Sequence, residues 1–197
     1  MRLSKLTLKN FRCFEHLEVD LHPRLTVLVG ENGAGKTAVL DALASALSPV
    51  LTYLSSANQR LKGRGIQDSD FRIVKLHQTN NKLRWGVADT TQLRLETFDG
   101  LIWDVWRAST TGKKPDQIMG QSELKHYVQT VVESYANEHP NLTPVIAYYG
   151  AQRGSIEVPK RLHAAKENYG YPASALIDAL NSRSDFREML AWFDQEE

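Results

Sequence analysis

Apolar and polar residues alternate along two short segments near the start of the chain, residues 3–8 and 17–21. This period of two is typical of strands that bury one face and leave the other in water. Residues 25–29 differ, because they are almost continuously apolar and run directly into Gly30. A short run of this kind predicts a central strand that is covered on both faces of a sheet.

Apolar residues recur at helical spacing in three later segments. We expect the first helix to follow a glycine-rich turn, to pack one apolar face against the sheet and to end at Pro49, because proline disfavours helical backbone in the residue before it. Its apolar positions are Val39, Leu40, Leu43, Ala46 and Leu47. Residues 122–136 and 184–193 carry similar stripes and predict two more helices.

Residues 71–107 show the pattern of antiparallel strands. Alternating segments are separated by short polar or glycine-containing turns, and the last two are joined by Asp99-Gly100, which favours a two-residue hairpin loop. The predicted strands are residues 71–76, 83–87, 93–98 and 101–106.

The remaining segments complete an α/β pattern. Residues 109–120 are rich in Thr, Gly, Lys and Pro and predict a loop, residues 144–150 predict a second buried strand, and residues 151–172 are polar and loop-like. The order of elements predicts an α/β fold with a mixed sheet, an antiparallel β-subdomain and flanking helices.

The composition is that of an ordinary globular protein. The 197 residues are 42% hydrophobic and 24% charged, which excludes disordered and collagen-like classes. The formal net charge is only +1, so no overall field recruits nucleic acid or a membrane surface. The single cysteine, Cys13, cannot form an intrachain disulfide, and no apolar run is expected to reach the roughly 20 residues that span a bilayer. We therefore expect a cytoplasmic protein without membrane contact.

Residues 30–37 read Gly-Glu-Asn-Gly-Ala-Gly-Lys-Thr, which fits the phosphate-binding pattern G-x-x-x-x-G-K-[ST] between a predicted strand and a predicted helix. Glycines let backbone N–H groups turn toward phosphates, and the following helix presents its positive end to the same anion. Lys36 is expected to contact the β- and γ-phosphates, and Thr37 to offer its hydroxyl to Mg²⁺. The predicted nucleotide-binding residues here are Gly30, Asn32, Gly33, Ala34, Gly35, Lys36, Thr37 and Ala38.

A phosphate loop does not by itself define the reaction, because kinases, GTPases, helicases and transporters share it. A GTPase would be expected to carry an Asn-Lys-x-Asp guanine reader. The nearest string, residues 81–84, reads Asn-Lys-Leu-Arg and lacks the aspartate. The sequence therefore favours ATP over GTP.

Three elements follow one another near the start of the chain: Lys-Asn-Phe-Arg-Cys-Phe at residues 9–14, the phosphate loop, and Leu-Asp-Ala-Leu at residues 40–43. Together they resemble the amino-terminal lobe of RecF/SMC-like ATPases, the ABC-type heads of chromosome-maintenance, DNA-repair and anti-phage proteins. The resemblance is firm over residues 1–47 and implies a P-loop NTPase fold. It also implies that Arg12 lies over the nucleotide; the alternative is a surface arginine at a strand end.

A second patch, Tyr-Tyr-Gly-Ala-Gln-Arg at residues 148–153, is similar to the end of the first lobe in OLD-like and Septu PtuA-like defence ATPases. There a glutamine after the strand senses Mg²⁺ and the γ-phosphate. The resemblance implies this role for Gln152, and the alternative is a solvated loop glutamine.

Other polar residues are expected to have structural or solvent-exposed roles. Asp68 and Asp70 are spaced like a carboxylate pair, yet no further metal ligand follows, so we expect a solvated turn. The six histidines show no ligand spacing. Lys113-Lys114 and Lys160-Arg161 are expected to lie in solvated loops, with contact to a phosphate backbone as the alternative.

Two elements that the resemblance leads us to expect are missing from the chain. Hydrolysis by such heads needs an apolar strand that ends in Asp-Glu and a Ser-Gly-Gly signature loop from an opposing head. Asp104 is followed by Val105, Asp178 is followed by Ala179, and no Ser-Gly-Gly string occurs. We therefore expect no catalytic base in this chain, with Lys36 and Gln152 as the residues that stabilise phosphate.

The chain is accordingly predicted to be a single incomplete head lobe over residues 1–197. Its predicted parts are a core at 1–50, an antiparallel β-subdomain at 70–107, a helix, strand and glutamine loop at 122–153, and a helical segment at 173–197 that leads into a second part.

The predicted function is ATP and Mg²⁺ binding in a DNA repair, DNA maintenance or anti-phage ATPase. Hydrolysis would require the second lobe and an opposing head in an ATP-dependent homodimer, so that this chain alone is nearly inactive. The resemblance also implies DNA and a nuclease as partners. The alternatives are an ABC transporter subunit, a non-hydrolysing module switched by nucleotide, and a small-molecule kinase.

Overall fold

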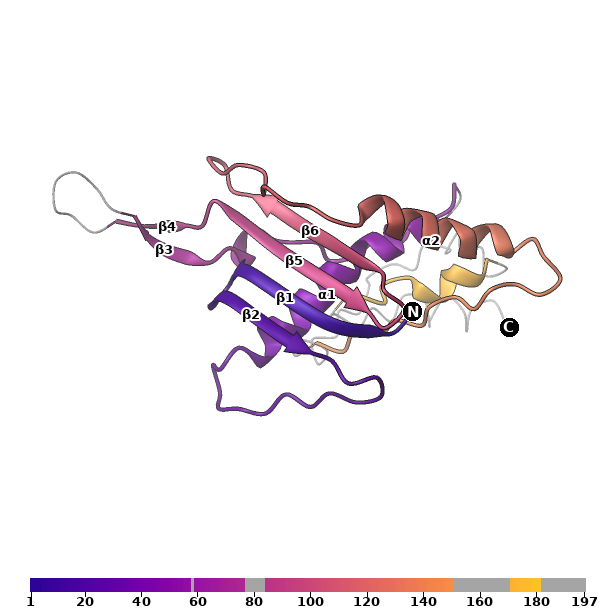
Figure 1. Ribbon diagram of the computed structural model, residues 1–197, viewed down its shortest axis with the longest axis horizontal. Helices are drawn as coiled ribbons and strands as arrows, with labels where there is room; N and C mark the ends of the chain where they lie inside the picture. Colours follow the sequence, from indigo (N-terminus) through magenta and orange to yellow (C-terminus); the bar gives the residue numbers. More distant parts are fainter. Residues whose placement is uncertain (58, 77–83, 151–170, 182–197) are drawn as a thin grey trace, which may run out of the picture.

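The computed structural model describes residues 1–57, 59–76, 84–150 and 171–181. It contains a four-stranded antiparallel sheet in the order β2-β1-β5-β6, a separate two-stranded sheet β3-β4, and the helices α1 and α2 (Figure 1). The elements are β1 (Leu3–Phe11), β2 (Phe14–Asp20), α1 (Lys36–Leu54), β3 (Ile73–Leu76), β4 (Arg84–Val87), β5 (Thr90–Thr97), β6 (Ile102–Ala108) and α2 (Gln121–Ser134), with 3₁₀ turns at Asp68–Asp70 and Pro172–Leu176. The combination of helices and sheets agrees with the predicted α/β fold, but every strand pair among the described residues is antiparallel, whereas a mixed sheet was predicted.

Alternation of side chains gives the larger sheet one apolar face. Leu6 and Leu8 of β1 lie opposite Leu95 and Leu93 of β5, and all four are fully buried. Trp103 of β6 lies on the same face, opposite Leu95, and its indole N–H donates to the Ala46 carbonyl of α1 at 2.9 Å. This face is therefore the one that packs against α1.

Helix α1 is the central helix of the core, and it continues through Pro49 to Leu54. The prediction that Pro49 ends the helix was wrong. Proline removes one hydrogen bond from the helix, but Val50, Leu51 and Leu54 beyond it are fully buried. Burial of such side chains contributes about 1.5–3 kcal/mol each, which outweighs the missing bond.

One described helix, α1, is long and apolar enough to cross a membrane by length and composition, contrary to the expectation from the sequence. Its most apolar window has a mean hydropathy of 1.4, and 56% of that window is buried inside the protein. The helix contacts α2 and strands β1, β5 and β6. We therefore assign α1 to the protein core.

The two apolar segments expected to be buried strands are not strands in the structure. Residues 25–29 form an extended loop that stands clear of the sheet (Figure 1), and Val29 is 89% exposed. Residues 144–150 have no ladder partner among the described residues, and Val145 is 95% exposed. A strand needs a neighbouring strand for its backbone N–H and C=O groups, and the described part of the chain provides none for either segment.

The predicted antiparallel region divides between the two sheets. Strands β5 and β6 join β1, whereas β3 and β4 pair only with each other among the described residues. The β5–β6 loop has three residues rather than two, because Thr97 N–H bonds the Leu101 carbonyl at 2.9 Å and Gly100 takes a φ of +83°. A left-handed third residue is typical of three-residue hairpin loops.

The remaining element predictions have mixed outcomes. Helix α2 confirms the stripe at 122–136, and residues 109–120 form neither helix nor strand, as expected. The helix predicted at 184–193 lies outside the described residues.

Candidate nucleotide-binding site

The predicted phosphate loop lies between the extended segment at 25–29 and the first turn of α1. The Lys36 ammonium points back into this loop and donates to the carbonyls of Gly30 and Glu31, each at 2.7 Å. Ala34 N–H donates to the Glu31 carbonyl at 3.2 Å, which closes a tight turn around Asn32 and Gly33. The loop therefore curls around the end of its own lysine side chain.

Gly35 is required at the junction of the loop and the helix for two reasons. Its φ of +92° is a left-handed backbone that residues with a Cβ rarely adopt. A Cβ at this position would also lie 2.5 Å from Phe14 Cζ and 3.0 Å from Cys13 Sγ. The turn between β1 and β2 thus packs directly against the phosphate loop.

The first turn of α1 supplies backbone donors to the same place. Gly35 gives the helix no side-chain cap, and the leading N–H groups of an α-helix, here from Lys36, Thr37 and Ala38, have no intrahelical acceptor. These donors, the positive end of the helix and the Lys36 ammonium form an anion-binding set. The exposed Thr37 hydroxyl adds a hard oxygen ligand. The set fits a Mg²⁺-bound polyphosphate.

Beside this loop, Arg12 pairs with two carboxylates that come from distant parts of the sequence. Its Nη1 lies 2.7 Å from Asp41 Oδ2 on α1, and its Nε lies 2.8 Å from Asp70 Oδ1. Arg12 has a φ of +49°, and its N–H donates to the Asp70 carbonyl at 2.8 Å. The guanidinium is therefore held between two carboxylates, so that contact with a nucleotide would require it to exchange one of these ion pairs.

Asp70 is the fully buried centre of the cluster. Besides Arg12, it accepts hydrogen bonds from Arg64 at 2.8 and 2.9 Å and from Gln67 N–H at 2.9 Å. Burial alone would raise the pKa of Asp70, but the hydrogen bonds from Arg64 and Gln67 and the neighbouring positive charges outweigh it, and the pKa lies below its ordinary value. The expectation of a solvated turn was therefore wrong for Asp70 and right for the exposed Asp68.

Tyr148 joins the segment at 144–150 to helix α1. Its hydroxyl donates to Asp41 Oδ1. Burial, together with the hydrogen bond to this carboxylate, raises the pKa of Tyr148 to about 12. Tyr148 is therefore a neutral donor at physiological pH, and it links the residues just before Gln152 to the helix that begins at the phosphate loop.

The match to known proteins covers nearly the whole chain. The sequence profile of the AAA domain family matches residues 5–194. The chain belongs to this family. Relatives of the chain include RecF and Rad50 proteins, which confirms the resemblance drawn from residues 9–43.

Individual relatives of this AAA domain are named for DNA repair or as ATPases. A DNA double-strand break repair Rad50 ATPase from Saccharolobus solfataricus is 35% identical over 52% of this chain and 11% of that protein. The RecF replication and repair protein of Rickettsia felis is 24% identical over 78% of this chain and 44% of that protein. The retron Ec83 probable ATPase of Escherichia coli is 22% identical over 99% of this chain and 35% of that protein. The chain thus spans less than half the length of each of these relatives.

Among solved structures, a chain studied for ATP-driven dimerization and DNA-stimulated activation of SMC ATPases overlaps 66% of this AAA domain and 78% of its own length. The TM-score is 0.31 and the identity is 15%.

Most other candidate residues of the AAA domain have structural roles or lie outside the described residues. Asp104, which ends an apolar run, is fully buried and pairs with Arg94 at 2.7 Å. No group of histidine, cysteine and acidic residues able to hold a metal occurs among the described residues. Lys113 and Lys114 are exposed, and Gln152, Lys160 and Arg161 lie outside the described residues.

The cluster around Asp70 was missed from the sequence. Arg12 and Asp70 are 58 positions apart, and Tyr148 and Asp41 are 107 positions apart. No local pattern joins residues at such separations. The only signal was the position of Arg12 and Asp41 within motifs on either side of the phosphate loop.

Proposed function

We propose that this AAA domain binds ATP with Mg²⁺ and is the first lobe of a RecF/SMC-like ATPase head that acts in DNA repair, DNA maintenance or anti-phage defence. The observation that carries the proposal is the phosphate loop at residues 30–37, which opens directly into the first turn of the core helix α1. One bound anion would therefore be contacted by the backbone donors of this turn, by the lysine and by the threonine hydroxyl.

The residues of the loop have separate roles in this proposal. The ammonium of Lys36 exchanges its bonds to the Gly30 and Glu31 carbonyls for bonds to the β- and γ-phosphates. The N–H groups at the start of α1 hold the phosphate oxygens, and the Thr37 hydroxyl binds Mg²⁺. The ion neutralises phosphate charge. Gln152 is assigned as the sensor of Mg²⁺ and the γ-phosphate.

A second lobe is part of the proposal because two apolar segments that were predicted as strands have no ladder partner among the described residues and expose part of their side chains. Residues 25–29 directly precede the phosphate loop, and residues 144–150 precede Gln152 in the sequence. We assign them as strands that pair with the second lobe, which would bury side chains such as Val29 and Val145. An opposing head would complete the site in an ATP-dependent homodimer. The names of the Rad50 and RecF relatives support DNA as a partner of the whole protein, and the nuclease partner is carried over from the sequence resemblance alone.

Titration with the fluorescent analogue mant-ATP in the presence of Mg²⁺ tests the nucleotide claim. We expect saturable binding, weakened about tenfold or more by Lys36→Ala, because a hydrogen-bonded charge is lost. Lys113→Ala is the matched control, since Lys113 is exposed in a loop outside the site. An intact chain that binds no mant-ATP, or equal losses in the two variants, would refute the proposal.

Steady-state hydrolysis tests the claim that the lobe is incomplete. We expect phosphate release by this chain to stay near background and to rise when the second lobe is present. Robust turnover by the chain alone, abolished by Lys36→Ala, would contradict the two-lobe proposal while leaving nucleotide binding intact.

A further inference from the structure

The β3–β4 hairpin projects from the body of the molecule, beyond the strand ends of the larger sheet where β1 ends and β5 begins (Figure 1). Its base is anchored where Phe71 bridges Phe11 and Arg72 N–H donates to the Asn10 carbonyl at 3.1 Å. The Arg72 side chain pairs with Glu15 at 3.0 Å. Beyond this base, no other described element makes extensive contact with the two strands. An isolated hairpin of this kind is marginal in water and gains stability from a partner.

The charge of this region differs from that of the rest of the chain. Residues 71–88 contain four of the 24 Lys and Arg residues and none of the 23 Asp and Glu residues. The chain therefore has a net charge near zero, although the charged residues in this region are all positive. Lys75 and Arg84 carry two of these charges on the described strands, and both are exposed.

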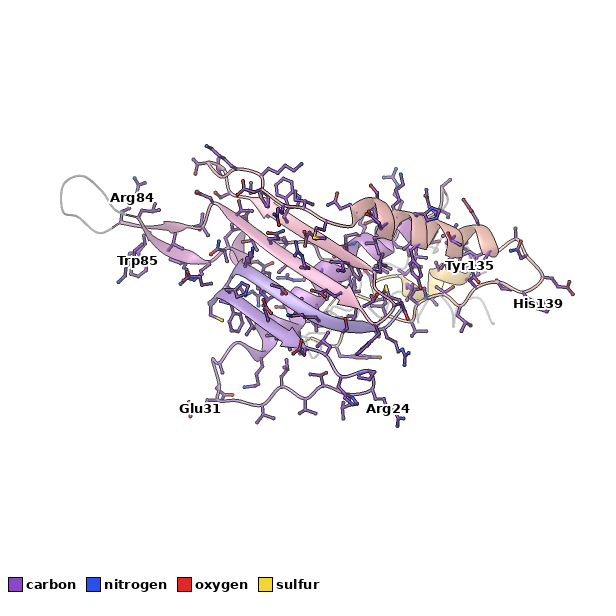
Figure 2. All side chains as sticks on the ribbon, viewed as in Figure 1. Arg24, Glu31, Arg84, Trp85, Tyr135 and His139 are labelled. Carbon is purple, nitrogen blue, oxygen red and sulfur yellow. The ribbon has the colours of Figure 1, made fainter. Side chains whose placement is uncertain are left out.

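One face of the hairpin is open and carries three apolar side chains and a lysine. Lys75 lies opposite Trp85 and Ile73 lies opposite Val87, so these four side chains share a face. Ile73 is 66% exposed and Trp85 is 62% exposed. The Lys75 ammonium lies 5.5 Å from the centre of the Trp85 ring. Arg84 and Trp85 extend to opposite sides of the hairpin in Figure 2.

We propose that this hairpin binds a single-stranded segment of nucleic acid. A base stacks on the exposed Trp85 ring, one backbone phosphate lies against Lys75 on the same face, and a phosphate further along the strand reaches Arg84 on the other side of the hairpin. An aromatic platform beside basic side chains is the arrangement that recognises unpaired bases and their phosphates together. The absence of acidic residues fits a polyanion and disfavours docking of one hairpin on a second copy, since like charges would meet.

This inference rests on the DNA-related function proposed above but not on the phosphate loop. The hairpin and the loop are separate surfaces, so each is tested with the other intact. The probe is a fluorescein-labelled oligothymidylate, compared with a duplex of equal length, and binding is followed by fluorescence anisotropy with the full 197-residue chain.

Trp85→Leu keeps an apolar side chain but removes the stacking surface, and we expect it to weaken oligothymidylate binding about fivefold or more, whereas Trp85→Phe retains most of the affinity. Lys75→Ala with Arg84→Ala should reduce the slope of log K against log salt by about 1.4, since each phosphate contact on a single strand contributes about 0.7. The duplex should bind more weakly than the single strand.

Lys113→Ala with Lys114→Ala is the matched control, because it removes two positive charges from an exposed loop outside the hairpin. The proposal would be overturned if the two double variants lost equal affinity, or if Trp85→Leu bound oligothymidylate as tightly as the wild type. It would also be overturned if neither probe bound, and that result would favour a protein partner for this face. Duplex binding as tight as single-strand binding would overturn the stacking role. Two cross-measurements distinguish failure of this proposal from failure of the nucleotide proposal. Mant-ATP binding is measured for the hairpin variants, and oligothymidylate binding is measured for Lys36→Ala.

Discussion

Replacement of Asp70 by asparagine tests whether the cluster beside the phosphate loop stabilises the fold. The carboxylate is fully buried and accepts four hydrogen bonds, from Arg12, twice from Arg64, and from the Gln67 N–H. Asparagine has a similar size, but it is neutral and has one acceptor oxygen. The variant therefore leaves the Arg64 guanidinium without its carboxylate partner and leaves Arg12 with Asp41 alone, while one amide oxygen replaces two carboxylate oxygens as acceptor.

The expected cost follows from the burial of the pair. Breaking a buried ion pair by removing one partner costs about 3–5 kcal/mol, because an uncompensated charge remains. Arg12 and Arg64 are partly exposed, with side chains 27% and 19% accessible, so water lowers the expected cost toward about 3 kcal/mol. For a chain of this length about 3 kcal/mol corresponds to a fall in Tm of roughly 6–12 °C.

Urea unfolding followed by circular dichroism gives the free energy of unfolding. Asp68→Asn is the matched control, since Asp68 lies in the same 3₁₀ turn but its side chain is 90% exposed and pairs only with Arg107 among the described residues. We expect this control to cost about 0–1 kcal/mol. If Asp70→Asn costs no more than Asp68→Asn, the cluster does not stabilise the fold as argued.

The same variant has a predictable dependence on pH. The pKa of Asp70 is lower in the folded protein than the ordinary value of 3.8, so the ionised carboxylate favours the folded state. The stability contributed by the ionised carboxylate is fully present above the ordinary pKa and is lost as the pH falls through the lower pKa of the folded protein. The stability difference between wild type and Asp70→Asn should therefore be constant near neutrality and shrink in acid; a constant difference down to the acid transition would contradict the assignment.

Two further variants test the packing of the loop and the link to Tyr148. Gly35→Ala should destabilise the protein by more than about 1 kcal/mol and weaken mant-ATP binding, because it adds a Cβ beside Phe14 to a left-handed backbone. Gly33→Ala, with a similar φ of +86° but nothing within 4 Å, is the control for backbone strain, and equal losses in both would show that the contact with Phe14 is unimportant. Tyr148→Phe should flatten the loss of stability between pH 10 and about 12, where the folded protein still holds a proton that the unfolded chain releases. Urea unfolding at several alkaline pH values measures this slope, and an unchanged slope would exclude the titration of the buried Tyr148 hydroxyl as its source.

Local patterns correctly predicted much of the fold. The alternation in residues 3–8 placed Leu6 and Leu8 in the core, and the stripe at 122–136 located α2. The phosphate loop could be predicted from the sequence because its pattern occupies eight consecutive residues and the helix that follows, so that sequence neighbours are also neighbours in space.

Tertiary contacts decided the features that the sequence did not. Pro49 lies inside α1 because burial of later residues outweighs a lost hydrogen bond. Residues 25–29 have no strand partner in the described part of the chain, because a strand depends on neighbours that its own sequence does not specify. The ion pairs of Arg12 likewise join positions far apart in the chain. The sequence by itself thus determined the phosphate loop and the faces of most strands and helices, whose physics is local. The packed ion cluster, the ends of the core helix and the projecting basic hairpin depend on which distant segments meet, and only the three-dimensional structure decided them.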